Sequence, residues 1–329
     1  MNAPMGGRPH VLVAGGTGFV GRALVRRLVA GGPRPRVTSR DAGAAVAALG
    51  TGAEILRADW VSGEGTEGAG DGIDVAYYLV HSMGSGSDFA ASDRAAAHRF
   101  VEEMARARVA RIVYLGGLGE DAGDLSPHLA SRREVERILR DGPVPVTTLR
   151  AAIILGAGGS SFEMLVQLVE KLPVMICPRW VSTPCQPVAL EELLRYLVGC
   201  ATEPQAIGQT FDAGGPEVLT YREMMQRVGD HLGRRPWIIE VPVLTPSLSS
   251  HWVGFITEVA SGVARPLVEG MRNPVVCRDD RLARLFPGPR LGFDAALDLA
   301  LEGRSPVHRR PRGPATGPRR SGGFKTPRV

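Results

Sequence analysis

The chain has 329 residues, a formal net charge of +5 and 44% apolar residues, an ordinary globular composition. The charge is unevenly placed. Residues 304–329 hold eight basic side chains and no acidic one, whereas the other 303 residues hold 31 basic and 34 acidic side chains. The body is therefore slightly acidic, and no specific nucleic-acid partner is expected. Residues 304–329 have too few apolar side chains to fold alone, which predicts a disordered basic tail.

Apolar runs and cysteine spacing indicate the cellular compartment that the sequence favours. No segment has the roughly 18 uninterrupted apolar residues of a transmembrane helix, and the N-terminus lacks the layout of a signal peptide. The four cysteines show no CxxC spacing and are expected as buried thiols in the cytoplasm, with no metal site. The segment 237–271, rich in Pro, Trp and aliphatic residues, predicts short helices and leaves open a weak contact with a membrane surface. Nothing here predicts an oligomeric state.

Apolar runs alternate with amphipathic segments in the first half. Strands are predicted at 10–14, 36–39, 53–57, 75–80, 111–115 and 144–155, and helices at 19–30, 88–108 and 126–140. Strands that alternate with helices predict an α/β fold with a doubly wound, Rossmann-type parallel sheet. The second half predicts a smaller, mostly helical portion, with a capping box from Thr220 to Glu223 before one helix.

These patterns divide the chain into three parts. Residues 1–158 are predicted to form an NAD(P)-binding Rossmann core. Residues 159–303 are predicted to form a substrate-binding portion, interleaved with the core near 185–215. Residues 304–329 are the predicted tail.

A glycine-rich turn, GGTGFVG, lies between the first predicted strand and the first helix. Such a turn brings backbone N–H groups to a pyrophosphate at the N-terminus of a helix, where the helix dipole favours an anion. Gly18 leaves room for that approach, and Gly21 allows close packing of helix on strand. A plain glycine-rich turn is the alternative, but the strand–turn–helix context favours a dinucleotide. The predicted cofactor residues of the turn are Gly15, Gly16, Thr17, Gly18, Phe19, Val20 and Gly21.

The residues after the second strand indicate which dinucleotide is bound. Arg40, assisted by Ser39, is placed to pair with a ribose 2′-phosphate, which favours NADP(H). Alternatively Asp41 binds the 2′-hydroxyl, and the cofactor is NAD(H). Asp59 and Trp60, after the third strand, are predicted to meet the adenine, with a buried structural Trp as the alternative.

The ends of the fourth and fifth strands are expected to face the same crevice. Leu79, Val80 and His81 end the fourth strand, and Gly116 ends the fifth. All four are predicted to contact the cofactor. For His81, a contact with nicotinamide or substrate and a purely structural hydrogen bond remain open alternatives.

Several segments further along the chain are more specific than the turn. They are YLVHSMG at 78–84 with Asp88-Phe89, HLASR at 128–132, LRAAIILGAG at 149–158, PRWV at 178–181 and AGGPEVL at 213–219. Here the chain resembles the atypical or extended short-chain dehydrogenase/reductases of the NmrA-like NAD(P)H-binding group, and most closely the bacterial YbjT-type NAD(P)-binding proteins. The resemblance spans about residues 9–300 and implies a Rossmann core, a nucleotide cofactor and a small-molecule substrate. It leaves the reaction open, because this group includes reductases, redox-sensing binders and accessory subunits.

The chain departs from the wider superfamily at its catalytic pair. Active members use Tyr-x-x-x-Lys on the helix after the fifth strand, with Tyr as acid/base. Here that spacing holds His128 and Arg132. We predict that His128 serves as proton donor or orienting group, and that Arg132 binds the ribose or a substrate anion. The alternative is that the pair only caps a helix and fills the cleft. A histidine of near-neutral pKa would suit proton transfer at pH 7.

Met83, Phe89, Phe162 and Trp180 are the predicted substrate contacts; core packing is the alternative for the apolar stripe that includes Phe162 and Trp180. An apolar wall would suit a hydrophobic ligand. The sequence thus favours an NADP(H)-dependent oxidoreductase that acts on a hydrophobic carbonyl or quinone-like compound. A non-catalytic NAD(P)-binding regulator or accessory protein is the alternative, supported by the missing Tyr and Lys.

Overall fold

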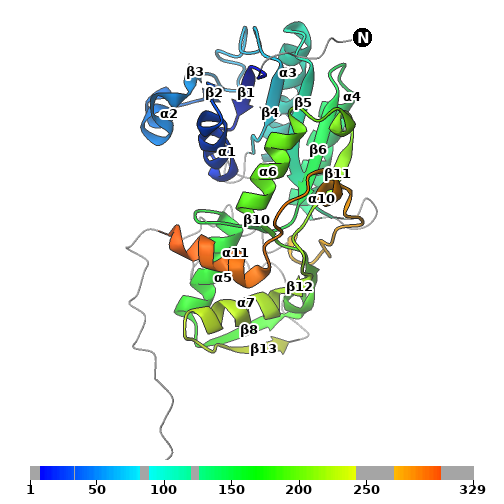
Figure 1. Cartoon of the computed structure of the whole chain (residues 1–329). Helices are drawn as coiled ribbons and strands as arrows, with labels where there is room; N and C mark the ends of the chain where they lie inside the picture. The colour runs from blue at the N-terminus through cyan, green and yellow to red at the C-terminus, as the bar shows by residue number, and fades with distance from the viewer. Residues whose placement is uncertain (1–7, 33, 82–88, 120–125, 242–269, 305–329) are drawn as a thin grey trace, which may run out of the picture.

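The computed structural model describes residues 8–32, 34–81, 89–119, 126–241 and 270–304. Its centre is a seven-stranded parallel sheet in the order β11-β6-β5-β4-β1-β2-β3 (Figure 1). This is the Rossmann strand order with one strand added at the β6 edge. The strands are β1 (Val11–Ala14), β2 (Arg36–Ser39), β3 (Glu54–Arg57), β4 (Val75–Tyr78), β5 (Arg111–Gly117), β6 (Val146–Ala151) and β11 (Thr210–Ala213).

Helices cover both faces of the sheet because its strands are apolar on both sides. Val11 and Val13 of β1 pack with α1 (Phe19–Ala30) and α6 (Leu190–Cys200) on one face. Leu12 and Ala14 pack on the other face with α3 (Phe89–Arg106) and α4 (Pro127–Asp141). A short helix, α2 (Ala42–Leu49), joins β2 to β3 through the 3-10 turn η1 (Gly50–Gly52). The predicted doubly wound parallel sheet is confirmed.

A smaller portion lies below the sheet in Figure 1. Its core packs α5 (Ser160–Lys171), α7 (Tyr221–His231) and α11 (Phe293–Glu302) together. Three two-stranded sheets border it: β8 (Val174–Pro178) with β13 (Trp237–Val241), β7 (Ile154–Leu155) with β10 (Val188–Ala189), and β9 (Pro184–Cys185) with β12 (Leu219–Thr220). The remaining elements are η2 (Arg179–Ser182), η3 (Pro204–Ala206) and α10 (Arg281–Leu285). Between β10 and β12 the chain returns to the central sheet as α6 and β11.

Three sequence-based predictions of elements need correction. The predicted strand 144–155 is broken at residues 152–153, because β7 leaves the central sheet to pair with β10. The start of the segment 237–271 is a strand, β13, rather than a helix, since it pairs with β8 along its whole length. Residues 242–269 lie outside the described part. The predicted capping box is present, with Thr220 and Glu223 bonded to each other's backbone N–H groups.

The boundary of the predicted tail also needs correction at Arg304. Its side chain is buried and forms ion pairs with Glu163 at 3.1 Å and Glu170 at 2.9 Å, both on α5. Arg304 therefore belongs to the folded body, tied to the smaller portion by two carboxylates.

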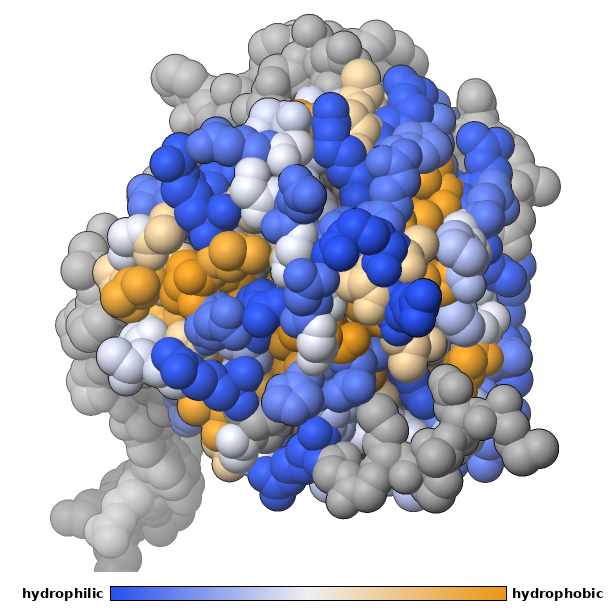
Figure 2. Space-filling view, turned by 90° about the horizontal axis from the view of Figure 1, so that it is seen from above, coloured by the Kyte–Doolittle hydropathy of each residue, from blue (hydrophilic) through white to orange (hydrophobic). Residues whose placement is uncertain are grey.

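The surface seen from above in Figure 2 is mainly hydrophilic, with apolar side chains gathered in a few smaller patches. In the described part of the chain, no helix is both long enough and apolar enough to cross a bilayer.

Candidate functional site

Close packing explains three glycines of the turn between β1 and α1. Gly15 has a φ of +84°, and a Cβ there would lie 2.6 Å from the carbonyl oxygen of Leu79. A Cβ on Gly21 would lie 2.2 Å from the carbonyl oxygen of Gly15, and one on Gly16 would lie 2.5 Å from Val37. Glycine at these positions lets the turn and α1 approach the ends of the strands.

Gly18 is different, because almost nothing in the protein requires it to lack a side chain. A Cβ there would have one close neighbour, the carbonyl oxygen of Gly15 at 3.3 Å, and Gly18 is exposed on a cavity wall. It is also the N-cap of α1, where no side chain caps the helix and no acid stands in the first turn. The open N–H groups and the helix dipole suit an anion at this point. The turn therefore fits a pyrophosphate.

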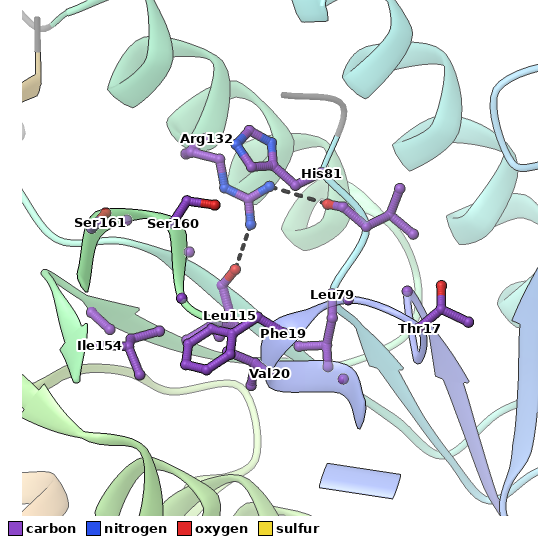
Figure 3. A pocket seen from close by; sticks show the side chains of 18 of the residues that line it. Thr17, Phe19, Val20, Leu79, His81, Leu115, Arg132, Ile154, Ser160 and Ser161 are labelled. Atoms are coloured by element: carbon purple, nitrogen blue, oxygen red, sulfur yellow. Dashed lines mark hydrogen bonds between the residues drawn. The ribbon is translucent and has the colours of Figure 1, made fainter. Parts of the chain in front are cut away.

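A cavity of about 1340 Å³ begins at this turn. Its wall includes the ends of β1, β4 and β5 and the first turns of α1, α4 and α5 (Figure 3). Ligand pockets commonly span about 300–1,000 Å³, so this one has room for a dinucleotide and a second molecule. The predicted cofactor residues on its wall are Gly15, Thr17, Gly18, Phe19, Val20, Gly21, Ser39, Arg40, Asp59, Trp60, Leu79, Val80, His81 and Gly116. Gly16 is buried beneath the turn.

At the predicted ribose end of the cavity, Asp41 and Arg40 differ in how they are engaged. The Asp41 carboxylate caps α2 by accepting the N–H of Ala44 at 2.9 Å, and the Asp41 carbonyl accepts the Ser39 hydroxyl at 2.9 Å. Arg40 is exposed, and within the described residues no hydrogen bond or ion pair engages its side chain. Trp60 is buried and donates from Nε1 to the Thr38 hydroxyl at 2.9 Å, so it is structural as well as cavity-lining.

At the other end, two histidines lie side by side. His81 follows β4 and His128 stands in the first turn of α4, with ring centroids 5.0 Å apart and planes inclined by 40°. His81 Nδ1 lies 3.3 Å from Asp93 Oδ2, and the Ser131 hydroxyl donates to the same oxygen at 3.2 Å. Ser126 caps α4 and Pro127 begins it, as the sequence predicts. The predicted His128 is thereby brought to the cavity wall.

Both imidazoles are held neutral. Burial, the neighbouring His81 and the Arg132 guanidinium lower the pKa of His128 to about 3. Burial and Arg132 also lower the pKa of His81, against the opposing effect of Asp93. The expected near-neutral pKa of His128 is therefore wrong, because the ring is desolvated beside a fixed cation. At pH 7 His128 is an uncharged donor and acceptor.

The side chain of Arg132 forms hydrogen bonds to backbone carbonyls. Its guanidinium donates to the carbonyl oxygen of Val80 at 3.1 Å and to that of Leu115 (Figure 3). It also lies over the Tyr114 ring, 5.1 Å from the ring centroid. It thus ties together the chain segments at the ends of β4 and β5. The binding of ribose or of a substrate anion by Arg132 stays a prediction. It would have to use the guanidinium N–H groups that do not already bind these two carbonyls.

The predicted substrate contacts are not brought together. Phe162 and Trp180 are buried in the core of the smaller portion and do not line the cavity, so core packing, the alternative for that stripe, describes both. Phe89 begins α3 and is also absent from the wall. Met83 lies outside the described residues. Tyr221, Met271 and Val275 line the cavity instead.

Sequence reasoning missed Asp93 and Ser131. Asp93 lies on the buried face of α3, next to the apolar Ala96, Ala97 and Phe100. A charged residue on such a face is a usable signal for a polar partner in the interior. Its partner, however, comes from a different element.

Comparison with known proteins places this geometry in a class. The family described as NAD(P)H-binding matches residues 15–168, the stretch that runs from the glycine turn into α5. A little under half of the chain thus matches an NAD(P)H-binding family, and the central sheet has the Rossmann strand order. This match, and the fold shared with the solved structures described below, are consistent with the predicted resemblance to the atypical short-chain dehydrogenase/reductases. The finer NmrA-like assignment stays a prediction.

Two curated relatives are reductases. The chain is 27% identical over 243 residues to ceramide reductase of Caulobacter vibrioides, covering 71% of this chain and 74% of that protein. It is 27% identical over 232 residues to the (4-alkanoyl-5-oxo-2,5-dihydrofuran-3-yl)methyl phosphate reductase of Streptomyces griseus, covering 68% and 74%.

Solved structures share the fold. An NADPH-dependent quinone oxidoreductase of Escherichia coli, complexed with NADPH, superposes with a TM-score of 0.71 at 16% identity, covering 88% of this chain and 98% of that one. A nucleoside-diphosphate-sugar epimerase of Staphylococcus aureus gives a TM-score of 0.71 at 13% identity, covering 88% and 99%.

Proposed function

We propose that the protein is an NADP(H)-dependent oxidoreductase that acts on a hydrophobic carbonyl or quinone-like compound. The observation that carries the proposal is a single cavity that runs from the Gly18 turn to His128 and on to the smaller portion. Reductase relatives and the NAD(P)H-binding match support the same class.

The residues present fit a nicotinamide dinucleotide. The first turn of α1 would hold the pyrophosphate, Trp60 and Asp59 would border the adenine, and the His81 side of the cavity would receive the nicotinamide. When bound, such a cofactor donates or accepts a hydride. The protein would supply orientation and a place for the proton.

Arg40 supports NADP(H) rather than NAD(H). Asp41 already caps α2, while Arg40 is exposed on the cavity wall at the end of β2, where a ribose 2′-phosphate would lie. We therefore expect Arg40→Ala to raise the Kd for NADPH by about tenfold or more, close to 1.4 kcal/mol, and to leave the Kd for NADH within about twofold. Isothermal titration calorimetry with both cofactors measures this.

Arg26→Ala is the matched control, because Arg26 is exposed on α1 and does not line the cavity. It removes the same charge and should change neither Kd. Equal loss of NADH and NADPH affinity in Arg40→Ala, or no loss of either, would contradict the NADP(H) preference.

The second half of the cavity supports an apolar substrate. Ile153, Ile154, Met271 and Val275 line it there. One relative is named for ceramide and another for an alkanoyl-bearing furanone phosphate. An apolar wall with a few polar groups is typical of sites for such compounds.

His128 supplies the chemistry at the substrate oxygen. Because it is neutral at pH 7, it acts by a hydrogen bond to that oxygen and by exchanging a proton with it. Burial keeps His128 neutral, and the guanidinium of Arg132, held by the Val80 and Leu115 carbonyls, adds to this effect. We propose that this arrangement replaces the missing Tyr and Lys.

The test is a screen of aliphatic and aromatic carbonyls and quinones with NADPH, followed by absorbance at 340 nm. We expect turnover with an apolar compound, and a loss of about 100-fold or more in kcat for His128→Ala with little change in the Kd for NADPH. NADPH binding without consumption on any compound would reject the enzyme proposal.

A second function has one observation in its favour. Helix α4 carries neither Tyr nor Lys, and the guanidinium of Arg132 is engaged by backbone rather than free for a ligand. An NAD(P)-binding regulator or accessory protein would show tight cofactor binding, no turnover and no effect of His128→Ala on that binding.

A further inference from the structure

Asp93, Ser131 and His81 form a buried polar cluster next to His128. The inference drawn from it extends the proposed function. Asp93 on α3 is 1% exposed. Its Oδ2 accepts the Ser131 hydroxyl at 3.2 Å and faces His81 Nδ1 at 3.3 Å. A carboxylate only accepts hydrogen bonds, so His81 carries its proton on Nδ1. The lone pair of His81 is therefore on Nε2.

Two buried ring nitrogens, one on each histidine, lack a hydrogen-bond partner within the part of the chain that the structure describes. His81 Nε2 and His128 Nδ1 are both buried, and neither has a hydrogen-bond partner among the described residues. Buried polar atoms without partners are rare and costly in proteins. The ring centroids lie 5.0 Å apart, a separation at which two imidazole rings can share an N–H···N hydrogen bond. Since His81 Nε2 is an acceptor, His128 must be the donor, from Nδ1.

We propose that Asp93 and His81 are positioning residues that fix the tautomer of His128, with the proton on Nδ1 and the lone pair on Nε2. Because Nδ1 is the buried nitrogen, Nε2 is the one left for the cavity. This inference rests on the proposed function for its chemical use. A substrate group that meets an acceptor at Nε2 is a hydroxyl, so the resting protein is suited to the alcohol or hydroquinone form of the substrate.

The proton balance follows from this geometry. In oxidation of an alcohol, the O–H bond of the substrate would break and its proton would form a bond to His128 Nε2, while a bound oxidised nicotinamide cofactor would accept the hydride from the hydroxyl-bearing carbon. The Nδ1 proton of His128 passes to His81 Nε2. The positive charge then lies on His81, where the Asp93 carboxylate stabilises it and the nearby Arg132 guanidinium opposes it. Reduction runs through the same atoms in reverse.

The tautomer is measured directly by nitrogen NMR on the full chain labelled with ¹⁵N-histidine, at pH 7.5 and without cofactor. We expect His128 to show a protonated Nδ1 and an unprotonated Nε2, the reverse of the tautomer that a free imidazole side chain prefers. A protonated Nε2 in the wild-type protein would overturn the proposal.

Asp93→Asn tests the role of the carboxylate. An amide can donate to His81 Nδ1, which moves the proton of His81 to Nε2 and that of His128 to Nε2 in turn. The catalytic-triad Asp→Asn change, a worked case of a wrong tautomer, acts in the same way. Glu102→Gln is the control, because Glu102 is exposed on the same helix. Its spectrum should equal that of the wild-type protein. An Asp93→Asn spectrum equal to wild type would also overturn the proposal.

His81→Phe provides a second variant should Asp93→Asn fail to fold. It removes the acceptor for His128 Nδ1 while keeping a ring, and His128 should revert to the Nε2-protonated form. Persistence of the Nδ1-protonated form would contradict the proposal. These spectra can be recorded without turnover. The expected tautomer together with no activity on any compound would reject only the proposed oxidoreductase function. Activity together with the other tautomer would reject only the proposed role of Asp93 and His81.

Discussion

Gly18 is the residue at which ligand binding and folding can be separated most cleanly. Its missing Cβ would meet only the Gly15 carbonyl oxygen at 3.3 Å, whereas a Cβ on Gly21 would lie 2.2 Å from the same atom. We expect Gly18→Ala to keep a near wild-type Tm and to raise the Kd for NADPH by about tenfold or more.

Gly21→Ala is the matched variant in the same turn. It should lower the free energy of unfolding by about 1–3 kcal/mol, because backbone must move to admit the methyl group. Urea unfolding and NADPH titration of both variants check the pair. Equal effects of the two substitutions on stability would contradict the assignment of Gly18 to the ligand.

His128 shows how far sequence reasoning reaches at a single residue. The spacing from the missing Tyr and Lys located His128 and Arg132 on one helix, and the structure puts both on the cavity wall. The protonation state was out of reach, because burial, His81 and Arg132 set the pKa together and come from different elements. Asp93 and Ser131 were missed for the same reason.

The lowered pKa values of His81 and His128 make stability depend on pH. A histidine whose folded pKa lies below 6.5 is more often protonated in the unfolded chain, so the free energy of unfolding falls as the pH falls from about 6.5 toward 3. For His128 alone the loss from pH 7 to pH 5 is about 2 kcal/mol.

Urea unfolding at the two pH values measures this loss. His128→Gln should remove about 2 kcal/mol of the pH dependence of the wild-type protein, whereas His98→Gln, exposed on α3, should keep it. An identical pH dependence for His128→Gln and wild type would show that the ring is not held neutral by burial.

Among the elements, α4 is linked by Arg132 to the ends of two central strands. Arg132 binds the carbonyl of Val80, which follows β4, and that of Leu115, near the end of β5. We expect Arg132→Met to lower the free energy of unfolding by about 2 kcal/mol, since two carbonyls lose a charged donor. Arg137→Met, exposed on the same helix, should change it by less than about 0.5 kcal/mol.

Chemical denaturation of the two variants gives the comparison. A loss of stability in Arg137→Met as large as in Arg132→Met would mean that helix α4, rather than the link to the strand ends, is what the substitutions perturb.

Most elements of the first half were predictable, because β1, β4 and β5 are buried apolar runs and the helices between them have amphipathic patterns. The late strands were not. β11 is only four residues long and joins the central sheet from a distant part of the chain, and β13 contains a Trp-Ile-Ile run that suits a helix as well as a strand. Long-range pairing with β6 and β8 decides both cases, and local sequence does not encode it.

For the molecule as a whole, the boundary between the slightly acidic body and the basic tail lies after Arg304 rather than before it. A chain that ends at residue 306 should bind NADPH with the wild-type Kd, because none of residues 305–329 is part of the predicted cofactor site. In that same shortened chain, Arg304→Ala should lower stability by about 2 kcal/mol, because Glu163 and Glu170 lose their buried partner.

Calorimetry and thermal unfolding of the two shortened chains separate these effects. A large loss of NADPH affinity on truncation alone would assign the tail a part in the site. Unchanged stability of the Arg304→Ala chain would mean that its ion pairs do not anchor the end of the body.

The central claim is that one cavity holds NADP(H) from the Gly18 turn to the two histidines. A crystal structure of the full chain with NADPH tests it most directly. We predict the pyrophosphate at the N-terminus of α1, the 2′-phosphate beside Arg40 and the nicotinamide beside His81 and His128. A cofactor bound elsewhere, or in the opposite direction along the cavity, would contradict the account.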